Sequence, residues 1–249
     1  MGGNGSPRTY GGGVNRHHNL WRTFMKLDRL LSTFAVLGAM ALASPPTRAA
    51  QQGEQGPPPE MGFFITSVGI GDGGDLGGLA GADAHCQSLA AAAGAGNRTW
   101  RAYLSTQGPG AVNARDRIGT GPWANAEGLI IGTSVDNLHY DNSNINWEHA
   151  LDENGEQFAS RIDGDPDFTE HDALTGSQID GTAFPPGEDR TCNNWTSNSE
   201  GSAWVGHADR YSFSTPGSPW NASHGTPGCT QENLVSVGGA GLLYCFAID

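Results

Sequence analysis

The sequence predicts a disulfide-pinned α+β domain, and three observations support this class. Four cysteines, an even number, lie downstream of an N-terminal segment that resembles an export signal. Apolar residues at helical spacing surround the first cysteine, Cys86, and a strand-like alternation surrounds the last, Cys245. A bridge between these two cysteines would tie the ends of the domain together.

Residues 1–43 are expected to be an N-terminal extension and a signal peptide. The apolar run Leu30–Ala43 follows basic residues and ends in Ala-Leu-Ala, which predicts cleavage near Ala43. This run is too short to span a membrane. Translation can begin at Met1 or at Met25, and the latter leaves a conventional signal peptide. The expected product is secreted, periplasmic or attached to the cell surface, with no membrane span.

The remainder divides into a linker and one domain. Residues 44–60 are rich in Pro, Gln and Gly, a composition that stays extended and solvated. Residues 61–249 contain all the patterned segments and are expected to form a single domain.

The charge balance limits the partners. The formal net charge is −13, and no lysine follows Ser44. A strongly acidic protein repels phosphate backbones and acidic glycans, so nucleic acid is not an expected partner. The four cysteines include no Cys-x-x-Cys pair, which favours disulfides over metal ligation in an exported chain.

Regular elements are expected at both ends of the domain. Residues 63–68 form a short apolar strand candidate before a glycine-rich stretch. Residues 80–93 have helical spacing, with Asp83 suited to the first turn and Gly94 supplying the stop. Residues 100–105 alternate as a half-buried strand does. The terminal run 241–249 alternates apolar side chains on both faces, as in a central strand.

Between these ends, Gln107–Arg190 has few long apolar runs and many Gly, Asn and Asp residues. It predicts long ordered loops with short strands. Disulfides and buried aromatic side chains can keep such loops folded, and binding sites are often found on them.

Five separated motifs carry a resemblance to known proteins, and they are Leu76–Cys86, Asn113–Ile118, Leu174–Ser177, Cys192–Ser197 and Trp220–His224. Their order resembles the endostatin-like branch of the C-type-lectin-like fold. The motifs themselves look like those of bacterial secreted proteins often labelled lectins, related to a spirochaete family of unknown function. The resemblance covers residues 61–249 and implies a mixed antiparallel sheet, a packed helix, long loops and two nested disulfides.

The resemblance also implies the disulfide pairing, Cys86 with Cys245 and Cys192 with Cys229. That is one of three pairings open to four cysteines. The Glu-Pro-Asn and Trp-Asn-Asp motifs with which C-type lectins coordinate calcium and sugar are absent.

Two groups of residues raise the question of metals. Asp163, Asp165 and Asp167 have the opening rhythm of an EF-hand, but the loop's glycine and closing glutamate are missing. A non-standard calcium site using these residues and Glu170 is the alternative to a solvated acidic loop. The histidines are scattered without zinc-site spacing, so structural hydrogen bonding is expected for them.

Ligand contacts are predicted in the segment that the second disulfide would close. Aromatic rings and planar amides there suit the C–H faces and paired hydroxyls of sugars. The candidate ligand-binding residues are Asn193, Trp195, His207, Asp209, Arg210, Asn221 and His224. The alternative is that Trp195 and Trp204 belong to the core and the asparagines cap turns.

The expected function is that of a secreted, non-catalytic binding domain with a glycan or an extracellular protein as its ligand. A structural or adhesive envelope protein that contacts proteins is one alternative. An extracellular polysaccharide hydrolase with a carboxylate pair is another. No catalytic residue is predicted, because the chain contains neither Gly-x-Ser-x-Gly nor His-Glu-x-x-His.

Overall fold

The computed structural model describes residues 57–139, 143–160, 169–210 and 219–249. The chain divides into two units, Met1–Gln52 and Gly53–Asp249, and every described residue belongs to the second. The predicted extension, signal peptide and cleavage near Ala43 lie outside the described residues. Residues 57–60 of the predicted linker are exposed. Within the described ranges, no helix combines the length and apolarity needed to cross a membrane.

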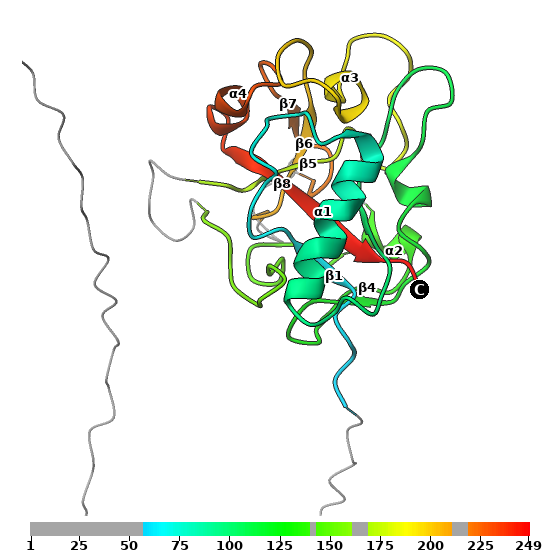
Figure 1. Ribbon diagram of the computed structural model, residues 1–249. Helices are drawn as coiled ribbons and strands as arrows, with labels where there is room; N and C mark the ends of the chain where they lie inside the picture. Colours follow the sequence, from blue (N-terminus) through cyan, green and yellow to red (C-terminus); the bar gives the residue numbers. More distant parts are fainter. Residues whose placement is uncertain (1–56, 140–142, 161–168, 211–218) are drawn as a thin grey trace, which may run out of the picture. The chain divides into compact units, whose positions relative to one another are not determined.

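The longest strand, β8 (Gly239–Ala247), forms the centre of a six-stranded mixed sheet (Figure 1). Strands β1 (Phe63–Ile65) and β2 (Trp100–Ala102) both pair antiparallel with it. Phe246 is opposite Phe63 in one pair and opposite Arg101 in the other, so β1 and β2 lie on opposite edges of β8.

Three further strands extend the sheet from the first half of β8. Strand β5 (Asp172–Leu174) pairs parallel with β8, and β6 (Trp204–His207) pairs antiparallel with β5. Strand β7 (His224–Gly225) pairs antiparallel with β6 and ends the sheet. Helix α4 (Gln231–Val235) leads from β7 back into β8 and is capped by the hydroxyl of Thr230.

The predicted helix is α1 (Gly78–Ala92), which buries Ala82, Cys86 and Ala90. It begins two residues earlier than the sequence pattern indicates, so Asp83 lies beyond the first turn. The carboxylate of Asp83 instead accepts hydrogen bonds from the backbone of Ala102, at 2.9 Å, and from Arg117, at 2.5 Å. It therefore ties the helix to the chain that follows rather than capping it.

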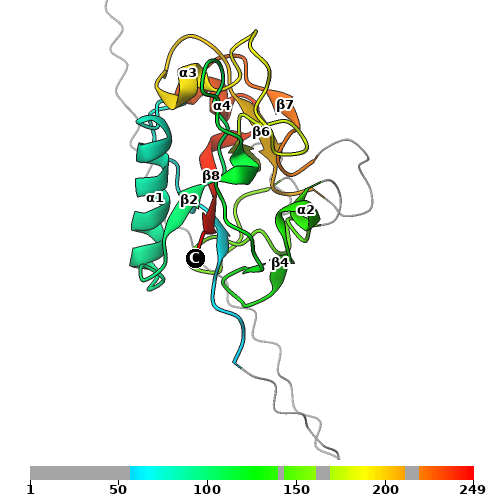
Figure 2. The ribbon, with the colours of Figure 1, turned by 90° about the vertical axis from the view of Figure 1, so that its right-hand side faces the viewer.

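In its described part, the segment predicted as long ordered loops contains short regular elements. Besides β5 they are η1 (Ala114–Asp116), β3 (Trp123–Ala124), β4 (Ile130–Gly132) and α2 (Val135–Leu138), with β3 and β4 paired as a separate two-stranded sheet. Figure 2 shows α1 on one side of β8, with β4 and α2 on the other.

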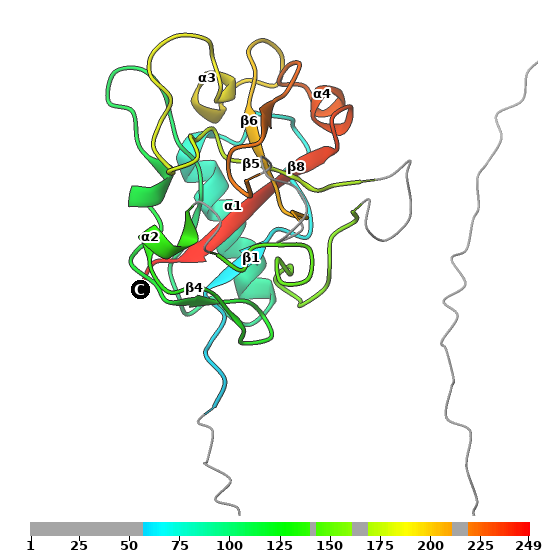
Figure 3. The same cartoon turned by 180° about the vertical axis from the view of Figure 1, so that it is seen from behind.

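The core has two parts because β8 is buried on both faces. Leu243, Cys245 and Ala247 pack with α1 and the late loops. The alternate residues of β8, on its opposite face, pack in a second cluster that is rich in aromatic rings. Figure 3 shows the domain from the side opposite to that of Figure 1, with α1 behind β8. The cluster includes Phe63, Tyr103, Trp123, Trp220, Tyr244 and Phe246. The predicted two-faced central strand is therefore confirmed.

Two disulfides join Cys86 to Cys245 and Cys192 to Cys229. The first links α1 to the second half of β8, and the second links Cys192, at the start of a short turn, to the loop before α4. The predicted α+β class, the mixed sheet and the two disulfides are confirmed.

Candidate functional site

A single left-handed helical turn, α3 (Cys192–Trp195), begins at the first cysteine of the second disulfide. Its four residues have φ values of 46°, 53°, 57° and 67°. The left-handed conformation costs roughly 1–2 kcal/mol for each residue with a Cβ, although asparagine tolerates it better than most. Four such residues in succession persist only where the surroundings impose the conformation, and strained backbone of this kind concentrates at functional sites.

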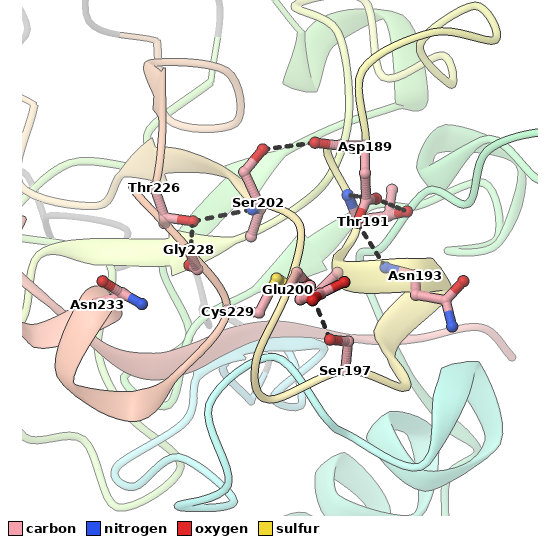
Figure 4. The surroundings of a disulfide bond; sticks show 12 residues. Asp189, Thr191, Asn193, Ser197, Glu200, Ser202, Thr226, Gly228, Cys229 and Asn233 are labelled. Carbon is pink, nitrogen blue, oxygen red and sulfur yellow. Dashed lines mark hydrogen bonds between the residues drawn. A yellow bond between two sulfur atoms is a disulfide. The ribbon is translucent and has the colours of Figure 1, made fainter.

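The surroundings that impose this turn are Asp189 and Thr191 together with the disulfide (Figure 4). One carboxylate oxygen of Asp189 accepts from the backbone N–H of Thr191, and the other accepts from that of Asn193, each at 2.9 Å. The hydroxyl of Thr191 accepts from the N–H of Asn194 at 3.1 Å. In Figure 4 the side chain of Asn193 points away from the disulfide.

A groove of about 340 Å³ lies against this turn. The side chain of Asn194 spans part of it, because its amide accepts from the backbone N–H of Gln107 at 2.7 Å and donates to the Gln107 carbonyl at 3.2 Å. Asn193 is exposed and makes one side-chain bond, to the hydroxyl of Thr196 at 2.9 Å. The lining residues are Gln107, Gly108, Pro186, Gly187, Asp189, Thr191, Asn193 and Asn194. The groove thus offers amide and carboxylate groups to solvent.

Arg190 follows the groove residue Asp189 in the sequence, and its side chain stacks on two aromatic rings. The guanidinium of Arg190 lies 4.3 Å from the ring centroid of Trp204 and 4.9 Å from that of Phe184. All three side chains are partly exposed. The sequence left open whether Trp204 belongs to the core or contacts a ligand. In the structure its ring is half-buried and is covered by Arg190.

Three of the predicted ligand residues are buried. The Trp195 ring is fully buried and donates to the carbonyl of Ser105 at 2.8 Å. Asn221 is also fully buried, and its amide donates to Tyr103 at 3.0 Å and to two backbone carbonyls. Arg210 donates to the carbonyls of Ser143 and Ile145. In this conformation these three side chains are not accessible to a ligand in solvent.

Besides Asn193, the remaining predicted residues are His207, Asp209 and His224. His207 and His224 lie against a residue that was not predicted, Asp172, and Asp209 lies against His171. The carboxylate of Asp172 is fully buried. One oxygen lies 3.1 Å from Nε2 of His171 and 3.2 Å from Nε2 of His207, and the other lies 3.4 Å from Nε2 of His224. Three of the histidines expected to be scattered structural groups are therefore gathered in one cluster.

Asp209 supports this cluster from behind. One of its carboxylate oxygens lies 3.3 Å from Nδ1 of His171 and accepts from the hydroxyl of Ser160 at 2.7 Å. The hydroxyl of Thr169 is 2.9 Å from the same ring nitrogen. His171 is thus held between two carboxylates, one at each ring nitrogen.

The electrostatics of the histidines differ. Burial lowers the pKa of His171, but hydrogen bonding and charge attraction from Asp172 and Asp209 outweigh it and raise the pKa to about 9. For His207, burial and the neighbouring His171 and His224 lower the pKa in spite of Asp172. Of these two histidines, His207 is therefore the one more readily kept neutral.

The calcium candidates are described only in part. Asp163, Asp165 and Asp167 lie outside the described residues. Glu170 is partly buried, and burial raises the pKa of its carboxyl group. The calcium site stays a prediction.

A larger hollow, of about 750 Å³, lies elsewhere on the domain. Its lining combines small residues such as Ala93 and Ala95 with polar and charged ones, and the latter are Glu60, Asn97, Arg98, Glu153 and Asn154. None of the residues predicted to bind a ligand lines this hollow. We therefore take the groove and the histidine cluster as the candidate sites.

Sequence reasoning identified the region of the groove but missed Gln107 and Asp189 as parts of it. An available signal was Asp189, since an aspartate two residues before a threonine is typical of a turn that bonds its own backbone. No short-range signal marks Asp172 or His171, because their partners come from other strands.

Comparison of the chain with protein-family models and with curated proteins finds no match. The class of protein is therefore defined by its structure: an α+β domain with a mixed sheet and two disulfides.

Proposed function

We propose that the protein is a secreted, non-catalytic binding domain of C-type-lectin-like, endostatin-like fold, and that it binds a glycan in the groove beside α3. The observation that carries this proposal is the left-handed turn. It keeps four non-glycine residues in a costly conformation and presents the amide of Asn193 next to the groove.

The chemistry of the groove supports a hydroxyl-rich ligand. Side-chain amides donate and accept at the same time, and paired sugar hydroxyls do the same. Asp189 and the amides of Gln107 and Asn194 are already fixed by backbone hydrogen bonds, so little side-chain entropy is lost on binding. The net negative charge of the chain favours a neutral glycan over an acidic one.

The proposal is tested with glycan-array binding of the wild-type protein and of Asn193→Gly. Glycine adopts a φ of 53° without strain, so this variant is expected to be as stable as the wild type. It lacks the exposed amide, and the loss of two hydrogen bonds of about 1 kcal/mol each lowers the affinity roughly tenfold or more. The matched control is Asn97→Gly, an exposed asparagine that lines the larger hollow instead.

Three outcomes are informative. Weakened binding in Asn193→Gly with normal binding in Asn97→Gly supports the groove. Equal binding in both variants shows that the glycan is bound elsewhere. If the wild-type protein binds no glycan, the glycan proposal is wrong. Capture of a protein from envelope extracts, or turnover of a chromogenic glycoside, would then favour one of the other two functions.

A further inference from the structure

The sheet register brings one carboxylate and two histidines to a single point. Asp172 on β5 is directly opposite His207 on β6, and His224 on β7 is opposite Val205, two residues before His207. Because side chains two residues apart in a strand share a face, Asp172, His207 and His224 lie on the same face of the sheet. His171 precedes β5 and approaches the same carboxylate from the side.

The ring nitrogens of His171, His207 and His224 lie at ion-pair distance, 3.1–3.4 Å, from the carboxylate oxygens of Asp172. Among the described residues, both oxygens of Asp172 and Nε2 of His207 are buried and have no hydrogen-bond partner beyond these contacts. Burying a carboxylate is costly, and in proteins the cost is normally offset by an ion pair or a metal ion. The imidazoles around Asp172 can serve in either way.

Two of the distances match a tetrahedral zinc site. Two ligand atoms bound tetrahedrally at 2.0–2.1 Å from zinc are about 3.3–3.4 Å apart. One oxygen of Asp172 lies 3.1 Å from Nε2 of His171 and 3.2 Å from Nε2 of His207, whereas His224 lies 3.4 Å from the other oxygen. The potential ligand atoms of His171, Asp172 and His207 all lie within 4.8 Å of one another.

The side chains that hydrogen-bond to the cluster also resemble those around a zinc site. A histidine that ligates zinc usually donates its other ring N–H to a carboxylate, which fixes the tautomer and the ring orientation. Asp209 occupies this position at Nδ1 of His171, and Ser160 holds Asp209.

We propose that His171, Asp172 and His207 bind a zinc ion and that His224 is its fourth ligand. Because a histidine ligates zinc in its neutral form, zinc binding displaces the proton from Nε2 of His171 and releases it to solvent. Imidazole and carboxylate ligands suit zinc, whereas calcium and magnesium take oxygen ligands only. His224 is the most accessible of the four, with 37% of its side chain exposed, so the ion enters and leaves from its side. The zinc site is independent of the proposed glycan groove, and either can be wrong alone.

The first test uses the wild-type chain, stripped with a chelator and dialysed. Calorimetric titration with zinc chloride is expected to give one ion bound per chain and a raised melting temperature, since an ion that binds only the folded state stabilises it. Cobalt(II) is expected to give the intense visible absorption of four-coordinate geometry. Calcium is expected to leave the zinc affinity unchanged, because it takes oxygen ligands only. No zinc binding, or stabilisation by calcium and not by zinc, would overturn the proposal.

The second test compares three histidine variants. His207→Ala is expected to lower zinc affinity at least 100-fold, and His224→Ala at least tenfold with a changed cobalt spectrum. The matched control is His85→Ala on α1, whose ring bonds the carbonyl of Val68, and it is expected to bind zinc like the wild type. Because His224 is partly exposed, its variant folds even if His207→Ala does not. Equal affinities in His224→Ala and His85→Ala would contradict the assignment of His224. Unchanged affinity in a folded His207→Ala as well would overturn the site.

Discussion

Replacing Cys86 and Cys245 together by alanine is expected to lower the free energy of unfolding by about 5 kcal/mol. The two cysteines are 159 residues apart, so the bridge closes most of the domain into one loop. In the chain-entropy model, the unfolded state regains the freedom of that whole loop when the bridge is removed. A loss of this size is comparable to the total stability of many single domains, so the variant is expected to be largely unfolded at 37 °C.

The matched comparison is the double variant Cys192→Ala/Cys229→Ala. These cysteines are only 37 residues apart, and the same model gives a loss of about 4 kcal/mol. Urea denaturation of both double variants measures the two losses. The model also predicts which structure is affected: the second variant loosens the late loops around α3 while the Cys86–Cys245 bridge stays intact. A larger loss in the second variant than in the first would contradict this ordering.

Gly206→Ala is expected to destabilise the domain by about 3 kcal/mol or more, the upper end of what overpacking costs. A Cβ at this position on β6 would lie 1.8 Å from the carbonyl oxygen of Trp220 and 2.6 Å from the Cα of Asn221. Both are backbone atoms, so no side-chain rotation relieves the clash. The same carbonyl of Trp220 accepts from the hydroxyl of Tyr244 at 2.7 Å, and displacing it also breaks this buried hydrogen bond.

Gly187→Ala is the control for this prediction. No atom lies within 4 Å of the Cβ it adds, and its φ is outside the left-handed region. The control variant is expected to be as stable as the wild type or more stable by about 0.4–1 kcal/mol, because alanine reduces the freedom of the unfolded chain. Thermal unfolding followed by circular dichroism compares the two. Equal melting temperatures for Gly206→Ala and the wild type would show that β6 and the Trp220 segment can separate without cost.

The features of the fold that depend on residues close together in the sequence were predictable. The alternation of Leu242, Leu243, Tyr244 and Cys245 reports a strand buried on both faces, since side chains in a strand point alternately to opposite sides. The spacing around Cys86 reports the buried face of α1 for the same local reason. The strands of the middle segment are two or three residues long, and so short a run leaves too little periodicity to detect.

The candidate sites were predictable only in outline. Trp195 stands beside two asparagines in the sequence, which suggested a sugar platform, but the left-handed turn directs its ring inward to the carbonyl of Ser105. Asn193, its neighbour in the same turn, remains exposed. The conformation that separates these two residues depends on Asp189, Gln107 and the second disulfide, which are contacts of the folded state.

By itself the sequence determined the α+β class, the central strand, the main helix and the number of disulfides, because local periodicity and cysteine content carry this information. Only the tertiary structure decided that His171, His207 and His224 meet at Asp172. They come from three separate segments of the chain, and the register of β5, β6 and β7 aligns them. Strand register is a long-range property of the packed sheet, so no spacing in the sequence records it.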